Sequence, residues 1–409
     1  MVENPLHRLT EEQIEALGRE FDELHEEVKA DLGDRDAAYI RGIIDLHRRL
    51  GLIGRMVLLG ARHKPAWVVG TATLSLAKIL ENMEIGHNVL HGQWDWMNDP
   101  VINSSAWDWD TASTAEAWKH SHNYIHHTYT NIRGKDKDLG YEIMRIDPHQ
   151  PWHPIYLLQP FYNVLLMAFF EWGVAFHDLD MEAIRKGEKT KAQLWEELKG
   201  IAHKARLQIQ KDYVSWPALS AVATTAVDYG IARAQGKDFD VPASLKRAFK
   251  ATLTADAAAN IIRNVWAHGI IFCGHFPDQT YTFSQEETEN ESRGAKYVRQ
   301  LIGAANIEGG PLFHVISGNL GYQVEHHLYP DMPSTRYGEI APRVREICMR
   351  YELPYNTGPL WKQWTMVHRT IARLAFPGGK PRPKPGPYKG EKIISSGEHE
   401  FRAKEAAQV

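Results

Sequence analysis

Apolar residues along this chain are gathered into a few long blocks that are separated by strongly polar segments. The blocks with the length of a spanning or buried helix are 66–82, 157–176, 213–232 and 253–274, with a shorter apolar run at 49–61. Charged residues such as Glu171, Asp228, Asp256 and Arg263 interrupt them, and each would cost about 3 kcal/mol at the centre of a bilayer. The pattern therefore predicts helices that either cross a membrane with their polar residues turned toward a site or form a buried core.

The polar segments also have helical spacing. Residues 9–31 predict an amphipathic surface helix, because Thr10 and Gln13 form a capping-box pattern and apolar residues follow at helical intervals. The segment 177–212 is helical in pattern but too charged to span a bilayer, so we expect it in water or on a membrane surface. Strand signals are few. The predicted fold class is all-α.

These patterns divide the chain into four regions. We expect a cytosolic N-terminal helical segment over 1–48, a main membrane domain over 49–355 and a C-terminal helix over 356–376. Residues 377–409 are rich in Pro, Gly and Lys, and this composition predicts a disordered tail. The N-terminus is acidic and lacks the basic start and apolar core of a secretory signal.

Composition removes several classes of function. The 409 residues include 47 basic and 51 acidic side chains, giving a net charge of −4, so the chain has no basic field that would favour a nucleic-acid partner. Its only cysteines, Cys273 and Cys348, are too few for a disulfide scaffold, a thiolate zinc ribbon or a four-cysteine iron–sulfur cluster. A reducing compartment is expected.

Histidines are concentrated in three short motifs. On a helix, an H-x3-H spacing places both imidazoles on one face, and an adjacent histidine points about 100° away, so that one helix can serve two metal ions. The motifs are HNVLH (His87, His91), HNYIHH (His122, His126, His127) and QVEHH (Gln323, His326, His327).

The three motifs together indicate a metal site. With 21 histidines in the chain, a single H-x3-H or HH match is expected about once by chance, so one motif alone carries little weight. Isolated histidines such as His203 and His314 are interpreted as structural, and His120 as a flank of the second motif. Imidazole ligands suit zinc, copper, iron or nickel. Seven or more ligands exceed what one ion accepts, which predicts a dinuclear centre.

The motifs resemble the three histidine boxes of the integral-membrane fatty acid desaturases and related hydroxylases. The contexts ENMEIGHNVLHGQWDWMND, HHTYTN and GNLGYQVEHHLYPDMP are similar to the bacterial acyl-CoA or acyl-lipid branch, and the resemblance runs from about 50 to 355. It implies an integral-membrane protein with about four transmembrane helices and a cytosolic helical cap. It also implies two iron ions, dioxygen as co-substrate, and formation of a cis double bond in an acyl chain, chemistry for which side chains alone supply no oxidant.

The resemblance further implies one more histidine ligand from the last apolar helix. The segment NVWAHGIIFCGHFPD offers His268 and His275, and His275 is preferred because it closes the helix. His268, Gln323, and Asn264 acting through a water, remain possible ligands or outer-shell groups. Of the acidic residues around the boxes, Asp138 is the first choice for orienting an imidazole. The others are Glu84, Asp95, Asp136 and Glu325.

All ligands must meet on one side of the membrane, so an even number of spans must separate the second box from the third. Of the three blocks between them, 157–176 is expected to lie along the interface, while 213–232 and 253–274 form a hairpin that returns His275 to the metal side. By resemblance, the protein is placed in the inner membrane with its active site facing the cytoplasm.

The electron donor is inferred from the cofactor motifs that the sequence lacks. It shows no nucleotide-binding GxGxxG fingerprint, no cysteine set for an iron–sulfur cluster and no fused haem motif. A separate electron-donor reductase of ferredoxin, flavin or cytochrome b5 type is therefore expected, with an acyl-CoA or acyl-lipid substrate. Two alternatives stay open: a hydroxylase or ketolase on the same scaffold, and a soluble histidine-rich metal-binding protein, which the mean hydropathy of −0.42 favours.

Overall fold

The computed structural model describes residues 4–390, and this part of the chain is almost entirely helical, as the all-α prediction requires. The longer helices are α1 (Glu11–Ala30), α2 (Asp34–Leu58), α3 (Lys64–Ile79), α10 (Lys191–Gln208), α11 (Trp216–Ala234), α12 (Val241–His275), α13 (Arg293–Gly303), α16 (Tyr337–Arg350) and α17 (Leu360–Leu374). The strands assigned within residues 4–390 are β1 (Asn306–Glu308) and β2 (Thr357–Pro359), which pair in parallel.

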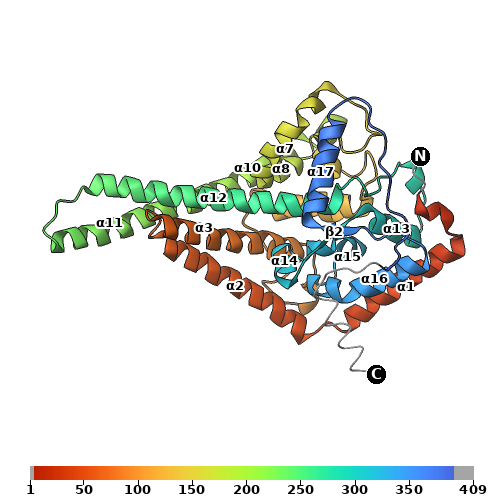
Figure 1. Cartoon of the computed structure of the whole chain (residues 1–409), viewed down its shortest axis with the longest axis horizontal. Helices are drawn as coiled ribbons and strands as arrows, with labels where there is room; N and C mark the ends of the chain where they lie inside the picture. The colour runs from red at the N-terminus through yellow and green to blue at the C-terminus, as the bar shows by residue number, and fades with distance from the viewer. Residues whose placement is uncertain (1–3, 391–409) are drawn as a thin grey trace.

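Two helical hairpins form an arm that projects from the rest of the molecule (Figure 1). Helices α2 and α3 make the first hairpin, α11 and α12 make the second, and α12 also packs on α3. The second hairpin is the one predicted between 213–232 and 253–274, but α12 begins earlier, at Val241, where the Asp240 side chain caps the Ala243 amide. With 35 residues, α12 is about 52 Å long. Within residues 4–390, the helices do not combine the length and the apolarity of a membrane-spanning segment.

Buried ion pairs join the two hairpins. The Asp212 carboxylate, at the base of the second hairpin, accepts hydrogen bonds from Arg55 of α2 at 3.1 Å and from Lys78 of α3 at 2.7 Å. Its side chain is fully buried. A second pair, Arg62 with Asp228, links the hairpins farther out along the arm. Because an unpaired charge in such a place is costly, these contacts fix the hairpins against each other.

The apolar block 157–176 is divided into two helices. It breaks at Phe169 into α7 (Gln159–Ala168) and α8 (Phe170–His177). The 10 residues of α7 extend about 15 Å, half the thickness of a bilayer core. The block is therefore not one continuous helix. The polar segment that follows contains α9 (Met181–Lys186), α10 and the π-helix Ile209–Ser215, as its helical pattern predicted.

The two ends of the chain pack on the body of the molecule. Helix α1 begins with the predicted capping box of Thr10 and Gln13, and its buried residues pack in one core with residues of α13, α16 and α15 (Gln323–Leu328). At the other end, residues after α17 form no helix or strand up to 390, although the Tyr388 amide donates to the Leu353 carbonyl at 2.9 Å. The remainder of the tail predicted to be disordered, 391–409, lies outside the described residues.

Candidate metal centre

Two of the three histidine boxes begin on π-helices. The first box begins at His87, the last residue of the π-helix Leu80–His87, which continues α3, and it ends at His91, just after α4 (Asn88–Leu90). The second lies on the π-helix Lys119–His126, between α5 (Ala115–Trp118) and α6 (His127–Tyr129). The sequence predicted ordinary α-helical geometry here. π-Helical turns are rare in proteins, and those that occur are often found at functional sites. The third box occupies the short helix α15.

The structure brings histidines from all three boxes and from α12 into two adjacent groups, and in each group the candidate ligand atoms lie within 4.8 Å of one another. The first group consists of His87, His91, His122 and His326, and the second of His126, His275 and His327. The two groups are neighbours, because the rings of His122 and His126 are 5.0 Å apart.

His127 and Gln323 complete the cluster. The ring of His127 lies 4.8 Å from that of His91 in the first group and 4.6 Å from that of His327 in the second. It therefore lies between the groups. His122 and His126, which the sequence predicted to point the same way, belong to different groups. The Gln323 amide nitrogen is 3.0 Å from Nε2 of His275, so this residue lies beside the second group.

The imidazoles are oriented so that one nitrogen is held and the other faces the cluster. Nδ1 of His126 is 3.0 Å from Asp136, Nδ1 of His326 is 3.1 Å from the Tyr337 hydroxyl, and Nδ1 of His327 is 3.0 Å from Gln300. An Nδ1–H that donates in this way leaves the Nε2 lone pair free to bind a metal. Six buried Nε2 atoms of the cluster have no hydrogen-bond partner among the described residues: those of His91, His122, His126, His127, His326 and His327.

Asp138 links the cluster to a further histidine. Its carboxylate lies 3.0 Å from Nδ1 of the predicted ligand His122 and 2.9 Å from Nε2 of His177. Burial on its own would lower the pKa of His177, but the hydrogen bond and charge of Asp138 raise it to about 8. His177 is therefore positively charged at neutral pH and holds Asp138 in place.

The acidic residues near the boxes divide by what they contact. Asp136 and Asp138 accept from cluster histidines, whereas Glu84 acts through Asn88, whose side-chain oxygen is 3.0 Å from Nδ1 of His87. For Asp95 and Glu325 the interpretation from sequence was wrong: Asp95 is bonded to Ser104, and Glu325 to Tyr355 and Asn306.

The sequence did not predict three residues that hold the cluster in place: Gln300 and Tyr337, which contact cluster histidines, and His177, which contacts Asp138. Gln300, Tyr337 and His177 come from α13, α16 and α8, and no local spacing connects them to the boxes.

The structure places His268 and Asn264 apart from the two groups. Seven residues of α-helix separate His268 from His275, which is about 10 Å along the axis. His268 instead stacks on Phe272 and lies 3.1 Å from the side-chain oxygen of Asn163. The Asn264 amide donates to the Ala168 carbonyl at 3.0 Å, although Asn264 also lines a cavity that reaches His87 and His275.

The donor set fits two ions that prefer imidazole nitrogen. Burial, followed by the neighbouring imidazoles, lowers the pKa of His91 and of His127 well below the usual value, so both are neutral. Neutral imidazole with an unpartnered nitrogen is the form that binds iron, zinc, copper or nickel. Two groups rather than one agree with the predicted dinuclear centre.

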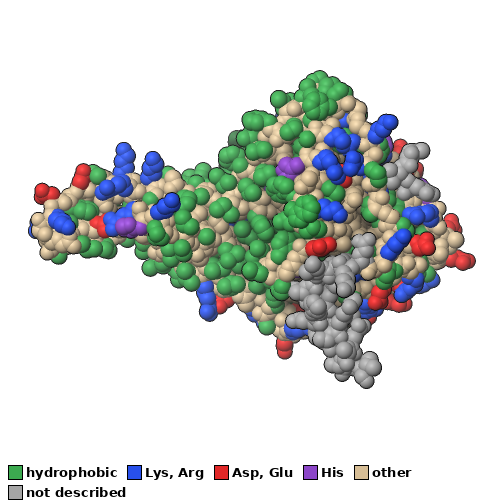
Figure 2. Space-filling view, viewed as in Figure 1, with side chains coloured by type: hydrophobic (Ala, Val, Ile, Leu, Met, Phe, Trp, Pro, Cys, Tyr) green, Lys and Arg blue, Asp and Glu red, His purple; other side chains and the backbone are tan. Residues whose placement is uncertain are grey.

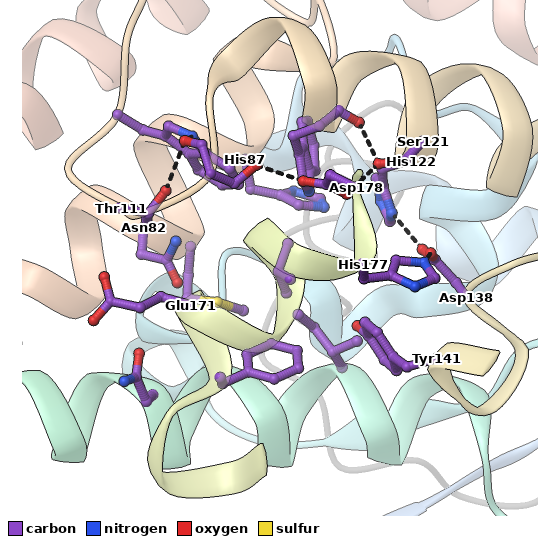
Figure 3. Close-up of a pocket in the computed structure, with 18 of the residues that line it drawn as sticks. Asn82, His87, Thr111, Ser121, His122, Asp138, Tyr141, Glu171, His177 and Asp178 are labelled. Carbon is purple, nitrogen blue, oxygen red and sulfur yellow. Dashed lines mark hydrogen bonds and ion pairs between the residues drawn. The ribbon is translucent and has the colours of Figure 1, made fainter. Parts of the chain in front are cut away.

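A cavity begins at His87, His122 and His275 and runs between α8, α12 and the loop before α5 (Figure 3). Asp138 and His177 point toward each other at one end of it (Figure 3). Most of its exposed wall is apolar, although Asp138, Glu171 and Asp178 add carboxylates. The apolar and aromatic wall residues are Met83, Trp109, Trp118, Tyr141, Phe170, Val174, Ile271 and Leu320. An apolar cavity that touches the candidate ligands has the shape and polarity of a site for an alkyl chain.

Comparison with known proteins identifies the class. The family model for fatty acid desaturases matches residues 65–359, and the chain belongs to the fatty acid desaturase family, whose members are oxidoreductases that introduce a double bond into an acyl chain. This excludes the interpretation as an ion-storage protein of another class.

Several curated desaturases are similar along most of the chain. An NADPH-dependent stearoyl-CoA 9-desaturase of Mycobacterium tuberculosis is 44% identical over 369 residues, which cover 90% of this chain and 82% of that protein. An sn-1 linoleoyl-lipid 6-desaturase of Synechocystis is 24% identical, covering 73% of this chain and 77% of the relative. A Delta(5) fatty acid desaturase A of Dictyostelium discoideum is 23% identical, covering 72% and 60%. No solved structure matches.

Proposed function

We propose that this protein is a di-iron desaturase that introduces a cis double bond into the acyl chain of a long-chain acyl-CoA. One observation carries the proposal: two adjacent groups of buried imidazoles, most of them with an unpartnered ring nitrogen, border an apolar cavity. The name of the mycobacterial relative, which specifies stearoyl-CoA and position 9, supports the choice of substrate.

The protein's own residues would hold the ions and position the chain. His87, His91, His122 and His326 would bind one ion, and His126, His275 and His327 the other, with His127 between them. Bound iron would supply the activation of dioxygen that removal of hydrogen from an unactivated methylene group requires. The apolar walls of the cavity hold the alkyl chain against the histidines and exclude water.

The substrate's reacting carbons would lie at the histidine end of the cavity. Trp118 supports this placement, because its ring stacks on His122 with centroids 4.6 Å apart and also lines the cavity. Tyr141, which also lines the cavity, has its ring centroid 5.2 Å from that of His177. These rings fix the imidazoles and at the same time contact the chain, so the distance between metal and substrate is set by rigid groups.

The two hairpins would insert into the inner membrane, with the metal centre on the cytoplasmic side. Hydrophobic side chains cover the arm and the adjoining face, while charged residues gather at its tip and at the opposite end of the molecule (Figure 2). The exposed apolar residues of the arm include Leu52, Ile53 and Met56 of α2, Val68 and Val69 of α3, and Leu219, Val222, Val227 and Ile231 of α11. The charges of Asp212 and Asp228 are turned inward and paired, which suits helices surrounded by lipid.

Electrons would come from a separate reductase. The sequence has no cofactor motif of its own for this purpose, and the relative is named as NADPH-dependent. A flavin or ferredoxin-type protein that accepts electrons from NADPH is the partner this suggests.

Product analysis tests the proposal. The protein is expressed together with a matching reductase in cells that lack desaturase activity, and fatty acids are profiled for new unsaturated and hydroxylated species. A new monounsaturated acid is expected, and a hydroxylated product would favour the hydroxylase alternative. His127→Ala should abolish the product while the protein stays in the membrane fraction. Retained activity in that variant would contradict the proposed site.

A further inference from the structure

A second cavity of about 360 Å³ also reaches the candidate metal centre. His275 lines both cavities. Leu139, Ile146 and Phe276 form an apolar part of its wall. The remainder comes from three segments: residues that follow the second box, residues that follow α12, and the end of α17 with the extended segment after it.

The wall of this second cavity carries more positive than negative charge. Its basic residues are Arg133, Arg373, Arg382 and Lys384, and its acidic residues are Asp147, Asp278 and Glu287. The nearby Arg369 adds a fifth cation, since it contacts Asp278 at 2.6 Å.

The ion pairs leave part of this positive charge without a partner. Arg382 lies 3.4 Å from Asp278, which Arg369 already holds, so two guanidinium groups share one carboxylate. Arg373 donates to the Lys380 carbonyl, but its buried Nε has no partner among residues 4–390. Burial, and then the neighbouring arginines acting against Asp278, lower the pKa of Arg373. An anion placed here would relieve this repulsion.

We infer that this cavity binds the phosphate-bearing head group of the acyl substrate, with the acyl chain leading past His275 into the first cavity. The inference rests on the proposed function and adds to it the recognition of the head group. Guanidinium groups bind phosphate through paired hydrogen bonds. A concave site of this size fits a small anion better than it fits the convex surface of a protein.

The C-terminal segment is an integral part of this site. The Arg145 guanidinium holds it by donating to the Gly378 carbonyl at 2.9 Å, and Lys384 donates to the Asp278 carbonyl at 3.1 Å. The family match ends at residue 359, so Arg373, Arg382 and Lys384 lie beyond it. The head-group site is thus built by a segment that the sequence composition alone assigned to a disordered tail.

Direct binding tests this inference without turnover. Purified full-length protein is titrated with unacylated coenzyme A and, separately, with a short-chain phosphatidylglycerol below its micelle concentration. Arg133→Gln with Arg382→Gln removes two cations, and each lost charged hydrogen bond weakens binding about tenfold or more. The matched control is Arg233→Gln with Arg247→Gln, which removes two exposed arginines of the arm and should bind like wild type.

The two titrations identify the source of the phosphate. If coenzyme A binds and the Arg133/Arg382 variant binds it more weakly, the site is assigned to a thioester substrate. If only the phospholipid shows this loss, the site is assigned to a lipid substrate. Both results support a phosphate site. If neither ligand binds, or the variant binds as tightly as wild type, the inference is wrong.

Steady-state kinetics provides the second measurement. The variant should raise the KM for the acyl substrate at least about tenfold, and more salt should raise the wild-type KM, because screening weakens the phosphate contacts. A variant that instead raises only the KM for the reductase, with coenzyme A binding intact, would show that the surface docks the electron donor and would overturn the inference. If wild type has no desaturase activity, the proposed function is wrong. The two titrations do not depend on turnover, so they still decide whether the cavity binds phosphate.

Discussion

Replacing Asp136 by Asn should weaken iron binding without unfolding the protein. The Asp136 carboxylate is fully buried and accepts three hydrogen bonds, from Nδ1 of His126 at 3.0 Å, from the Asn131 amide at 2.7 Å and from the Asp138 amide at 3.0 Å. Asn has the same shape but no charge, and it presents an NH2 group where one of the two oxygens accepted. At least one donor therefore loses its acceptor, and His126 loses the anion that orients it.

The size of the effect follows from two independent figures. A hydrogen bond to a charged group contributes about 1.5–3 kcal/mol, and loss of a group that orients a metal ligand typically costs about 10- to 100-fold in metal affinity. Both agree with about 2 kcal/mol, or about 30-fold. The assay is iron content per chain after equilibration against a graded series of chelator concentrations.

The matched control is Asp95→Asn, an identical change close to the first box. The Asp95 carboxylate accepts hydrogen bonds from the amide and the hydroxyl of Ser104, at 2.7 and 2.6 Å. Its chelator midpoint should equal that of wild type. The reasoning is refuted if Asp136→Asn retains iron to the same chelator concentration as wild type, or if both variants lose it equally.

Three further predictions concern other parts of the molecule. The pKa of His177 is raised to about 8, so its charged contact with Asp138 stabilises the folded state fully below about pH 6.5, and this stabilisation is lost as the pH rises through 8. In urea unfolding, the free energy of unfolding of wild type should exceed that of His177→Gln by about 2 kcal/mol at pH 6 and by little at pH 9. An equal difference at both pH values would contradict the assignment. Val174→Phe should fill the first cavity and lower the desaturation rate at least about tenfold while iron is retained. Val164→Phe, on the exposed face of α7, should leave the rate unchanged. Equal activities of the two variants would show that the acyl chain binds elsewhere. Asp212→Ala removes the carboxylate that pairs with Arg55 at 3.1 Å and with Lys78 at 2.7 Å, which leaves Lys78 only the longer contact with Asp110 at 3.7 Å. The variant should have a free energy of unfolding about 3–5 kcal/mol lower than wild type, a loss that thermal unfolding would detect.

Sequence spacing identified the histidines of the candidate metal centre because most of them come in local motifs. His87 with His91, and His122 with His126 and His127, are each close in the chain, and His275 was distinguished from His268 by its place at the helix end. The structure puts all of these near one another. Spacing is informative here because backbone geometry fixes the relative direction of side chains a few residues apart.

The parts that sequence did not predict depend on contacts between distant segments. Gln300 and Tyr337 support His327 and His326 only because α13 and α16 pack beside α15. The π-helical form of two boxes has no composition signal, because it arises where tertiary contacts favour an extra residue in a turn. The disorder expected from residue 377 onward followed from composition alone, and it missed the anchoring of residues such as Lys384 to the body.

The pairing of Asp212 with Arg55 and Lys78 has a consequence for how the protein is made. The two cations emerge from the ribosome more than 130 residues before their partner, since Lys78 and Asp212 are separated by 134 positions. Until the second hairpin is synthesised, Lys78 can pair with Asp110, at 3.7 Å, but not with Asp212, and Arg55 lacks the carboxylate with which it pairs. Assembly of the arm must therefore be completed late in translation, and a chain arrested between the hairpins should be a substrate for quality-control proteolysis.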